Sequence, residues 1–360
     1  MTSPPAPLPA IEASGLVKTY SGGIRALDGL TFAVPAGTVF GMLGPNGAGK
    51  STAVKILTTL SKADAGQARV AGIDVARHPD RVRLAIGYVA QKSGTDREAT
   101  GRENLLLQGR FFGLGGRALK GRVAEMLERF GLAGAADRVA SGYSGGMQRR
   151  LDLAASLVGR PRVLFLDEPT TGLDPRARLG MWDIIRSLVA GGTTLLLTTQ
   201  YLDEADELAD EIVVIDHGLV IAAGTSEELK NRVGGDVIEF TVPDRSRAAD
   251  AIAAIKPIGE GEPHADSETG VVSVGVGARG SDALIEAVRA LDAAGVASHG
   301  LALRRPSLDD VFLALTGHAA EDEQPNERRR RPRGRGRAED PRRGDPESRS
   351  SRDDTAKAAS

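Results

Sequence analysis

The sequence predicts an α/β protein whose main domain has a mainly parallel β-sheet and a helical insertion, followed by a smaller α+β domain. Between Ile11 and Val233, short apolar runs rich in β-branched residues alternate with helical patterns. This alternation is typical of βαβ units. Within that stretch, residues 100–159 contain consecutive helical patterns without a strand. From Asp236 to Arg305, shorter strand and helix patterns alternate again.

The expected strands of the main domain are apolar at consecutive positions, as in a sheet that helices cover on both faces. These strands are Val39 to Leu43, Ile86 to Ala90, Val163 to Asp167, Thr194 to Thr199 and Ile212 to Asp216. The insertion is expected to contain the helices Glu103 to Phe112, Ala118 to Phe130 and Gly145 to Leu157. In the smaller domain we expect strands at Val237 to Val242, Val271 to Val276 and Leu301 to Arg304, and helices at Arg247 to Ile255, Asp282 to Asp292 and Leu308 to Leu315.

Changes in composition set the predicted domain boundaries. Residues 1–10 are rich in Pro and Ala and are expected to be a disordered leader, residues 11–233 form the main domain, and residues 234–317 form the smaller one. Residues 318–360 are expected to be a disordered, charged tail, because they cannot bury enough apolar surface to fold. The arginine-rich run from Arg328 to Arg337 is either part of a solvated tail or a contact for anionic lipid.

The composition excludes several classes of protein. The chain has 360 residues and a formal net charge of −2, so no global field attracts nucleic acid. It has no cysteine, which excludes disulfides, thiol catalysis and thiolate-bound metal clusters. Its start lacks the basic and apolar segments of a secretion signal. No apolar stretch approaches the length of a membrane-spanning helix, so any membrane process would need a partner.

Residues 44–51 match the phosphate-loop pattern G-x-x-x-x-G-K-[ST]. They are Gly44, Pro45, Asn46, Gly47, Ala48, Gly49, Lys50 and Ser51, followed by an expected helix from Thr52 to Leu60. The glycines let backbone N–H groups approach phosphate oxygens, and the helix N-terminus adds partial positive charge. We expect Lys50 to bridge the β- and γ-phosphates of a nucleotide and the Ser51 hydroxyl to bind Mg²⁺.

The strand Val163 to Asp167 ends in two consecutive carboxylates, Asp167 and Glu168. A parallel strand delivers them to the carboxyl edge of the sheet, where the phosphate loop also lies. We expect Asp167 to hold Mg²⁺ and Glu168 to act as general base towards the attacking water. Neighbouring strand residues face opposite ways, so a bend at Pro169 is expected to bring both side chains to the site.

A second helix start that is able to bind phosphate follows Tyr143, at Ser144, Gly145 and Gly146. Ser144 is a good N-cap, and the glycines leave their N–H groups accessible. With this S-G-G motif, the phosphate loop and the acidic pair, residues 11–233 resemble the ABC ATPase family. The resemblance implies a P-loop NTPase fold with a mixed sheet and a helical subdomain.

The resemblance also implies a mode of assembly and several site residues. In that family, two copies bind head to tail, and the S-G-G motif of each caps the nucleotide held by the other. Tyr20 resembles the aromatic residue that stacks on adenine. Gln91 resembles the glutamine that senses Mg²⁺ and links to the permease. Asp174 resembles the aspartate that contacts the partner copy, and Thr52 completes the nucleotide-binding residues.

Gln200 departs from the family pattern, which usually has a histidine at this position. An amide can donate a hydrogen bond to the γ-phosphate but carries no charge. Phosphoryl transfer depends mostly on positioning and electrostatics, so this substitution does not exclude catalysis. The run Thr199 to Asp206 and the segment Arg305 to Phe312 are similar to those of the daunorubicin-resistance exporter ATPases, and this second similarity extends to about residue 317.

We therefore predict an ATP- and Mg²⁺-dependent ATPase subunit of an exporter for a drug or another hydrophobic compound. It would lie at the cytoplasmic face of the cell membrane and work with a second copy of itself and a separately encoded permease. Three alternatives have to be weighed. A soluble ABC ATPase acting on ribosomes or nucleic acid usually has two ATPase modules or a long coiled coil. A GTPase or small-molecule kinase does not require the S-G-G motif. An importer shares the same ATPase core, so the core does not distinguish import from export.

Overall fold

The structure is a computed structural model that describes residues 8–232, 235–266, 269–277 and 279–316. These residues belong to one compact unit. The predicted tail at residues 318–360, with its arginine-rich run, lies outside the described residues, as do the first seven residues of the predicted leader. The backbone N–H of Ala10, at the end of the leader, donates to the Val34 carbonyl at 2.8 Å.

A six-stranded sheet with the order β10-β9-β3-β8-β7-β6 forms the centre of the main domain. All of its neighbouring strands are parallel except β10, which is antiparallel to β9. The strands are β3 (Val39–Leu43), β6 (Ile86–Val89), β7 (Val163–Asp167), β8 (Thr194–Thr198), β9 (Glu211–Asp216) and β10 (Leu219–Gly224). The five expected strands are thus confirmed, and β10 is a strand that the sequence analysis missed.

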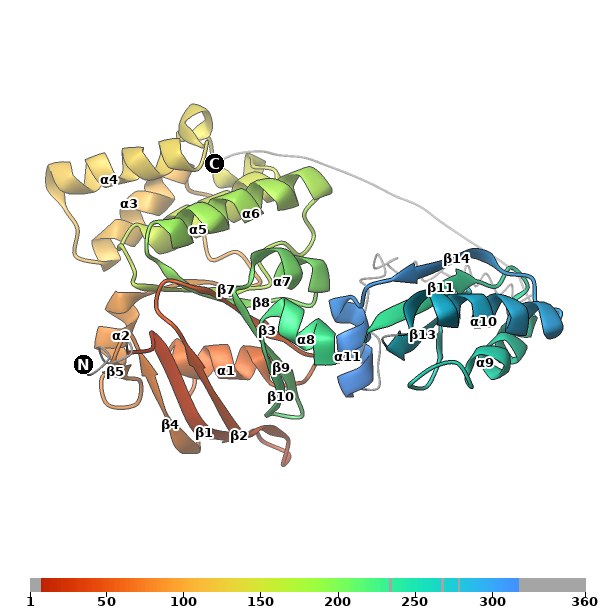
Figure 1. The fold of residues 1–360 in the computed structure, drawn as a ribbon. Helices are drawn as coiled ribbons and strands as arrows, with labels where there is room; N and C mark the ends of the chain where they lie inside the picture. Colours follow the sequence, from red (N-terminus) through yellow and green to blue (C-terminus); the bar gives the residue numbers. More distant parts are fainter. Residues whose placement is uncertain (1–7, 233–234, 267–268, 278, 317–360) are drawn as a thin grey trace, which may run out of the picture. The chain divides into compact units, whose positions relative to one another are not determined.

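The two faces of this sheet bury alternate residues of each strand in separate cores. Val163 and Phe165 of β7 pack into a core with helix α1 (Lys50–Leu57). Leu164 and Leu166 pack into the opposite core with helices α5 (Gly145–Leu157) and α6 (Pro175–Ala190). Figure 1 shows these helices on the two sides of the strands. Because both faces are covered, the strands are apolar throughout.

A second sheet, which the sequence analysis did not predict, packs beyond α1 and is antiparallel, with the order β2-β1-β4-β5. Its strands are β1 (Ile11–Thr19), β2 (Arg25–Val34), β4 (Ala65–Val70) and β5 (Ile73–Asp74). Register shifts interrupt the pairing of β1 with both of its neighbours. These irregularities disturb the alternation of apolar and polar residues that identifies a strand in a sequence. The mainly parallel sheet is therefore only part of the β-structure.

The helical insertion contains the predicted helices, each within a few residues of its expected bounds. Helix α3 (Gly101–Phe111) begins with a capping box formed by Thr100 and Glu103. Helix α4 (Gly116–Arg129) follows, and α5 leads back to the sheet. The remaining helices of the main domain are α2 (Pro79–Ala85), α7 (Leu202–Leu208) and α8 (Ser226–Arg232).

The smaller domain has the order strand, helix, strand, strand, helix, strand, as in the split βαβ arrangement. Its elements are β11 (Asp236–Thr241), α9 (Ala248–Ile255), β12 (His264–Ala265), β13 (Val271–Gly277), α10 (Gly280–Ala293) and β14 (His299–Arg304). The sheet order is β12-β13-β11-β14. The short strand β12 was not predicted, since two residues carry no periodic pattern. Helix α11 (Leu308–Thr316) packs through Val311 and Phe312 on the core that contains Leu43.

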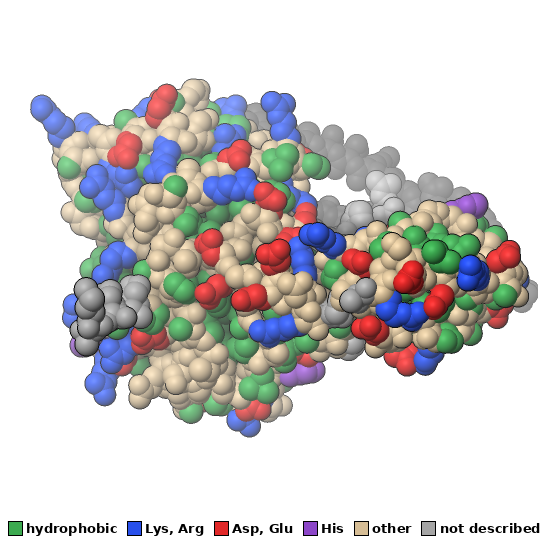
Figure 2. All heavy atoms as spheres, in the orientation of Figure 1, with side chains coloured by type: hydrophobic (Ala, Val, Ile, Leu, Met, Phe, Trp, Pro, Cys, Tyr) green, Lys and Arg blue, Asp and Glu red, His purple; other side chains and the backbone are tan. Residues whose placement is uncertain are grey.

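No helix of the described residues is both long enough and apolar enough to cross a bilayer. Figure 2 shows acidic and basic side chains interspersed over this face of the molecule, without a large area of one sign.

We expect Asp310→Asn to lower the stability of the α11 region by about 2 kcal/mol at pH 7. The Asp310 carboxylate accepts from Arg304 and from the backbone N–H of Ser307. Burial alone would raise the pKa of Asp310, but these donors outweigh it and hold the pKa below its ordinary value. The stabilisation is therefore fully present above the ordinary aspartate pKa and is lost as the pH falls through the depressed pKa of the folded state.

Scanning calorimetry of wild type and variant between pH 7 and pH 3 would test this prediction. The difference between the two melting temperatures should shrink below about pH 4. Asp292→Asn, at an exposed position on α10, is the control and should melt like wild type. A difference in melting temperature between wild type and Asp310→Asn that stays constant with pH would contradict the role given to this carboxylate.

Candidate functional site

Four neighbouring strands bring the predicted site residues to the carboxyl edge of the central sheet. The phosphate loop follows β3, and the acidic pair ends β7. Strand β8 lies between them and pairs through Thr198 with both Met42 and Asp167. Gln91 follows closely after β6, which pairs with β7. This edge of an open parallel sheet is where ligands bind in α/β folds.

The phosphate loop has a backbone that only glycine allows at key positions. At Gly49, φ is 111°, and an added Cβ would lie 2.5 Å from the Ala26 carbonyl oxygen. At Gly44, an added Cβ would lie 2.3 Å from the Ile215 carbonyl oxygen. The helix begins at Lys50, two residues earlier than predicted, so Gly49 occupies its N-cap position. Its first N–H groups are thus directed at the loop.

Lys50 is 6% exposed and is held within the loop. Its ammonium group donates to the carbonyl oxygens of Gly44 and Pro45. The helix N-terminus and this buried ammonium group concentrate positive charge at one point, which suits phosphate. The backbone that only glycine can adopt and this positive charge both fit the loop to the phosphates of a nucleoside triphosphate.

The two carboxylates diverge because the chain turns at Glu168. Glu168 has φ of 49°, in the left-handed region. The chain therefore begins to turn at Glu168, and the predicted bend position, Pro169, lies in the turn that follows. Asp167 is buried, and its Oδ1 accepts from the Thr198 hydroxyl at 2.6 Å. The Glu168 Oε2 accepts from the Gln91 amide at 2.7 Å. The non-glycine φ at Glu168 is the kind of local strain found at active sites.

The surroundings of Asp167 are polar in composition but largely closed to solvent. Burial, together with the neighbouring Asp167 carboxylate, raises the pKa of Tyr88 to about 12. The hydroxyl of Ser51, the carboxylate of Asp167 and the amide oxygen of Gln91 are hard oxygen donors of the kind that Mg²⁺ prefers. The residues present therefore fit this ion, although the Gln91 amide nitrogen is directed at Glu168 here.

Arg149 is the residue of the site that the sequence analysis overlooked. It is 8% exposed and extends from α5 to four backbone carbonyl oxygens. These belong to Ala90, Asp167, Glu168 and Pro169, at 2.6 to 3.1 Å. Burial lowers the pKa of Arg149. The guanidinium thus ties the S-G-G helix to the ends of both β6 and β7.

A helical pattern in the sequence would have identified Arg149. Arg149, Asp152, Leu153, Ser156 and Leu157 share the buried stripe of α5 at the spacing of a helix face. An arginine on such a stripe requires acceptors. The carboxylate of Asp152, on the same stripe, accepts from the hydroxyls of Ser93 and Thr95 in the segment after Gln91.

The S-G-G motif lies on a separate, solvent-facing hollow of about 620 Å³. Ser144 and Gly145 are exposed there, and the Ser144 hydroxyl caps α5 by accepting from the Met147 N–H at 3.3 Å. Asp174 lines the same hollow and caps α6 by accepting from the Ala177 N–H at 2.9 Å. None of the described residues lining this hollow comes from the phosphate loop.

Gln200 and Tyr20 lie near different parts of the phosphate-loop region. Gln200 shares a small hollow with Gly44, Pro45 and Asn46 of the loop, and Phe312 of α11 also lines it. Tyr20 is 39% exposed, and its hydroxyl donates to the Thr52 hydroxyl at 3.4 Å. The Lys18 ammonium lies 5.8 Å from the centre of this ring. An aromatic ring that is partly exposed beside the start of α1 can stack on a flat ligand.

A buried polar contact joins the helix that Asp174 caps to the helix that follows Gln200. The indole N–H of Trp182, on α6, donates to Glu204 on α7 at 3.2 Å. Burial raises the pKa of Glu204, which favours its neutral form. The loops that carry Asp174 and Gln200 are therefore linked through side chains of the protein interior.

Comparison with known proteins places the chain among transporter ATPases. The profile of the ABC transporter family matches residues 27–171. Over 318 residues, the chain is 54% identical to the daunorubicin resistance ATP-binding protein DrrA2 of Streptomyces coeruleorubidus, covering 88% of this chain and 98% of the relative. Over 325 residues, it is 40% identical to the Nod factor export ATP-binding protein I of Ralstonia nicotianae, covering 89% and 98%.

Two of the solved structures that the chain resembles are ATP-binding proteins. An ATP-binding subunit of an ABC transporter has a TM-score of 0.57 and 27% identity, covering 62% of this chain and 92% of that one. A dimeric ATP-binding cassette in a post-hydrolysis state with ADP and phosphate has a TM-score of 0.56 and 25% identity, covering 60% and 98%.

We expect Arg149→Met to lower kcat for ATP hydrolysis about a hundredfold while changing nucleotide affinity little. The variant loses the donor that fixes the backbone of Asp167 and Glu168, whereas the phosphate loop makes no hydrogen bond with Arg149 among the described residues. Stability should also fall by about 3 kcal/mol, because buried carbonyl groups lose their partner.

Steady-state hydrolysis and fluorescent-nucleotide titration would separate these two effects. Arg110→Met is the matched control, since Arg110 is exposed on α3 and should be replaceable without effect. A folded Arg149→Met protein with wild-type kcat would refute the positioning role.

Proposed function

The chain belongs to the ABC transporter ATP-binding proteins of the daunorubicin and doxorubicin resistance type, and we propose that it drives export through a separate membrane permease. It binds and hydrolyses ATP. The observation that carries the detailed proposal is that the phosphate loop, through Gly44 to Asn46, and the S-G-G motif line separate hollows of one chain. A single terminal phosphate can contact both only if they come from different copies.

The phosphate loop, residues 44–51, binds the phosphates of ATP, and Lys50 lies against the β- and γ-phosphates. Tyr20 stacks on the adenine, with Thr52 at the start of α1 beside it. In the closed dimer, Ser144, Gly145 and Gly146 of one copy direct their free N–H groups at the γ-phosphate held by the other. Asp174 borders the same hollow, so it lies at the contact between the copies.

Glu168 is the general base of hydrolysis. Its carboxylate accepts a proton from water as the water oxygen attacks the γ-phosphorus and the bond to ADP breaks. The amide of Gln91 orients this carboxylate before nucleotide arrives. Mg²⁺, held by Ser51, Asp167 and Gln91, would neutralise negative charge on the phosphates. The Gln200 amide donates a hydrogen bond to the γ-phosphate and carries no proton in the reaction.

The permease docks in a hollow of about 450 Å³ beside the strand that precedes Gln91. Leu60, Leu107 and Phe111 line it, and the side chain of Phe111 is 72% exposed. Large exposed apolar side chains around a hollow mark an interaction site. Thr95 and Asp152 line the same hollow and are hydrogen-bonded to each other, which connects it to α5.

The cargo is a drug-like or other hydrophobic compound, in keeping with the names of the relatives that act in daunorubicin and doxorubicin resistance. Relatives named for Nod factor export also match over most of the chain. The name of this second group favours export over import and over a soluble role on ribosomes or nucleic acid. The subunit works at the cytoplasmic face of the membrane, bound to its permease.

We expect Glu168→Gln to reduce ATP hydrolysis about a thousandfold and to trap a dimer with Mg-ATP. Binding is retained, because the phosphate loop and the S-G-G motif are unchanged, while proton abstraction is lost. Size-exclusion chromatography with light scattering measures the dimer, and phosphate release measures turnover.

Lys50→Ala, added to Glu168→Gln, is the control for nucleotide dependence. The double variant should stay monomeric with Mg-ATP, because the ammonium group that faces the phosphates is gone. Near-wild-type hydrolysis by Glu168→Gln would disprove the general-base assignment. A dimer in the double variant would show that association does not depend on nucleotide.

We expect Phe111→Ser to abolish co-purification with a membrane protein while the purified subunit keeps its ATPase activity. Tagged chain is isolated from detergent-solubilised membranes of its own cells, and the associated proteins are identified by mass spectrometry. Ile285→Ser, which removes an equally apolar exposed side chain on α10, should leave the association intact. Equal recovery of the permease with both variants would place the docking surface elsewhere.

A further inference from the structure

A hollow of about 720 Å³ lies at the opposite edge of the central sheet from the phosphate loop. Thr194 and Val163, which line it, are the first residues of β8 and β7, whereas the site described above follows the last residues of these strands. Neither nucleotide nor the proposed permease surface accounts for this hollow.

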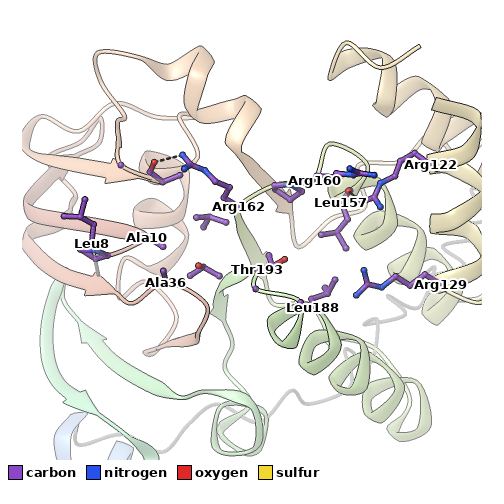
Figure 3. Close-up of a pocket in the computed structure, with 18 of the residues that line it drawn as sticks. Leu8, Ala10, Ala36, Arg122, Arg129, Leu157, Arg160, Arg162, Leu188 and Thr193 are labelled. Carbon is purple, nitrogen blue, oxygen red and sulfur yellow. Dashed lines mark hydrogen bonds between the residues drawn. The ribbon is translucent and has the colours of Figure 1, made fainter. Parts of the chain in front are cut away.

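Four arginines line this hollow from two directions. Arg122 and Arg129 extend from α4, two helical turns apart on one face, and Arg160 and Arg162 precede β7. Figure 3 shows Arg122 and Arg129 on the helical side of the hollow and Arg162 and Thr193 towards the strands. Glu125 is the only acid among the described residues that line it, and it pairs with Arg122 at 2.7 Å.

The four arginines differ in the hydrogen bonds and ion pairs that they make within the protein. Arg122 is 12% exposed and donates to the carbonyl oxygens at the end of α5, so its role is structural. Arg162 donates one bond to the Ala71 carbonyl at 2.6 Å. Arg129 has a single long contact of 3.5 Å to the Ser187 carbonyl. Arg160 has no side-chain hydrogen bond or ion pair with any described residue, although its φ of 53° is unusual for a non-glycine residue.

Three arginines without a carboxylate partner leave an excess of positive charge in one hollow. Guanidinium groups match phosphate oxygens through paired N–H donors. A phosphate monoester carries between about 1.5 and 2 negative charges at pH 7, so two such groups balance three arginines. The Thr193 hydroxyl, also in the lining, adds a neutral donor.

The hollow is larger than an inorganic ion requires and has an apolar side. Leu8, Pro161 and Leu188 line it together with the arginines. Its volume is in the range of sites for organic ligands, which combine an apolar wall with a few polar groups. We propose that this hollow binds an organic compound with two phosphate groups, which joins α4 of the helical insertion to the amino-terminal ends of β7 and β8.

Isothermal titration calorimetry with fructose 1,6-bisphosphate as the probe tests the proposal, with saturating Mg-ADP present to occupy the phosphate loop. Wild-type protein should bind one probe molecule per chain. Arg129→Gln/Arg160→Asn should bind it about tenfold more weakly or worse, since charge-assisted contacts from both sides of the hollow are lost. Asparagine is chosen at residue 160 because it tolerates positive φ.

Arg117→Gln is the matched control, because Arg117 is exposed on α4 but does not line the hollow. It should bind the probe like wild type, and the double variant should keep wild-type ATP hydrolysis, which shows that it is folded. Hydrogen exchange of α4 should slow in wild-type protein when the probe is bound. Unchanged binding by the double variant, or no binding by wild type at about 1 mM probe, would overturn the proposal. Citrate or inorganic phosphate binding as tightly as the probe would overturn its assignment to an organic bisphosphate.

Discussion

The Arg149 guanidinium is the interaction on which the geometry of the catalytic edge depends. It donates to four carbonyl oxygens, which belong to Ala90, Asp167, Glu168 and Pro169. A buried charge of this kind is tolerated only when its donors are satisfied. The same contact therefore fixes the S-G-G helix, the strand before Gln91 and the acidic pair in one arrangement. The helical insertion can therefore move relative to this edge only if the hydrogen bonds of Arg149 break or if their acceptors move with it.

The central sheet and the phosphate loop could be predicted because each rests on local sequence patterns. Apolar runs gave the five parallel strands, and the spacing of Gly44, Gly49 and Lys50 identified the loop. The site residues at or just after the end of a strand, such as Asp167 and Gln91, could be placed at this edge for the same reason. Their roles came from the family resemblance, because spacing alone does not tell a ligand of Mg²⁺ from a solvated acid.

What could not be predicted depends on contacts between distant parts of the chain. The antiparallel sheet has irregular pairing, so its strands lack a clean alternating pattern. The left-handed turn at Glu168 is imposed by surroundings that include the Thr198 carbonyl, which accepts from the Glu168 N–H. The packing of α11 beside the phosphate loop, with Phe312 next to Gln200 and Pro45, joins residues more than a hundred positions apart. Such contacts leave no periodic trace in the sequence.

The link between α6 and α7 has an optical consequence. Trp182 is the single tryptophan of the chain and is 9% exposed. Its indole N–H rests on Glu204, so its emission depends on whether the two helices stay together. A change in the emission wavelength or intensity of Trp182 would therefore report when the loops that carry Asp174 and Gln200 move apart. No attached dye would be needed.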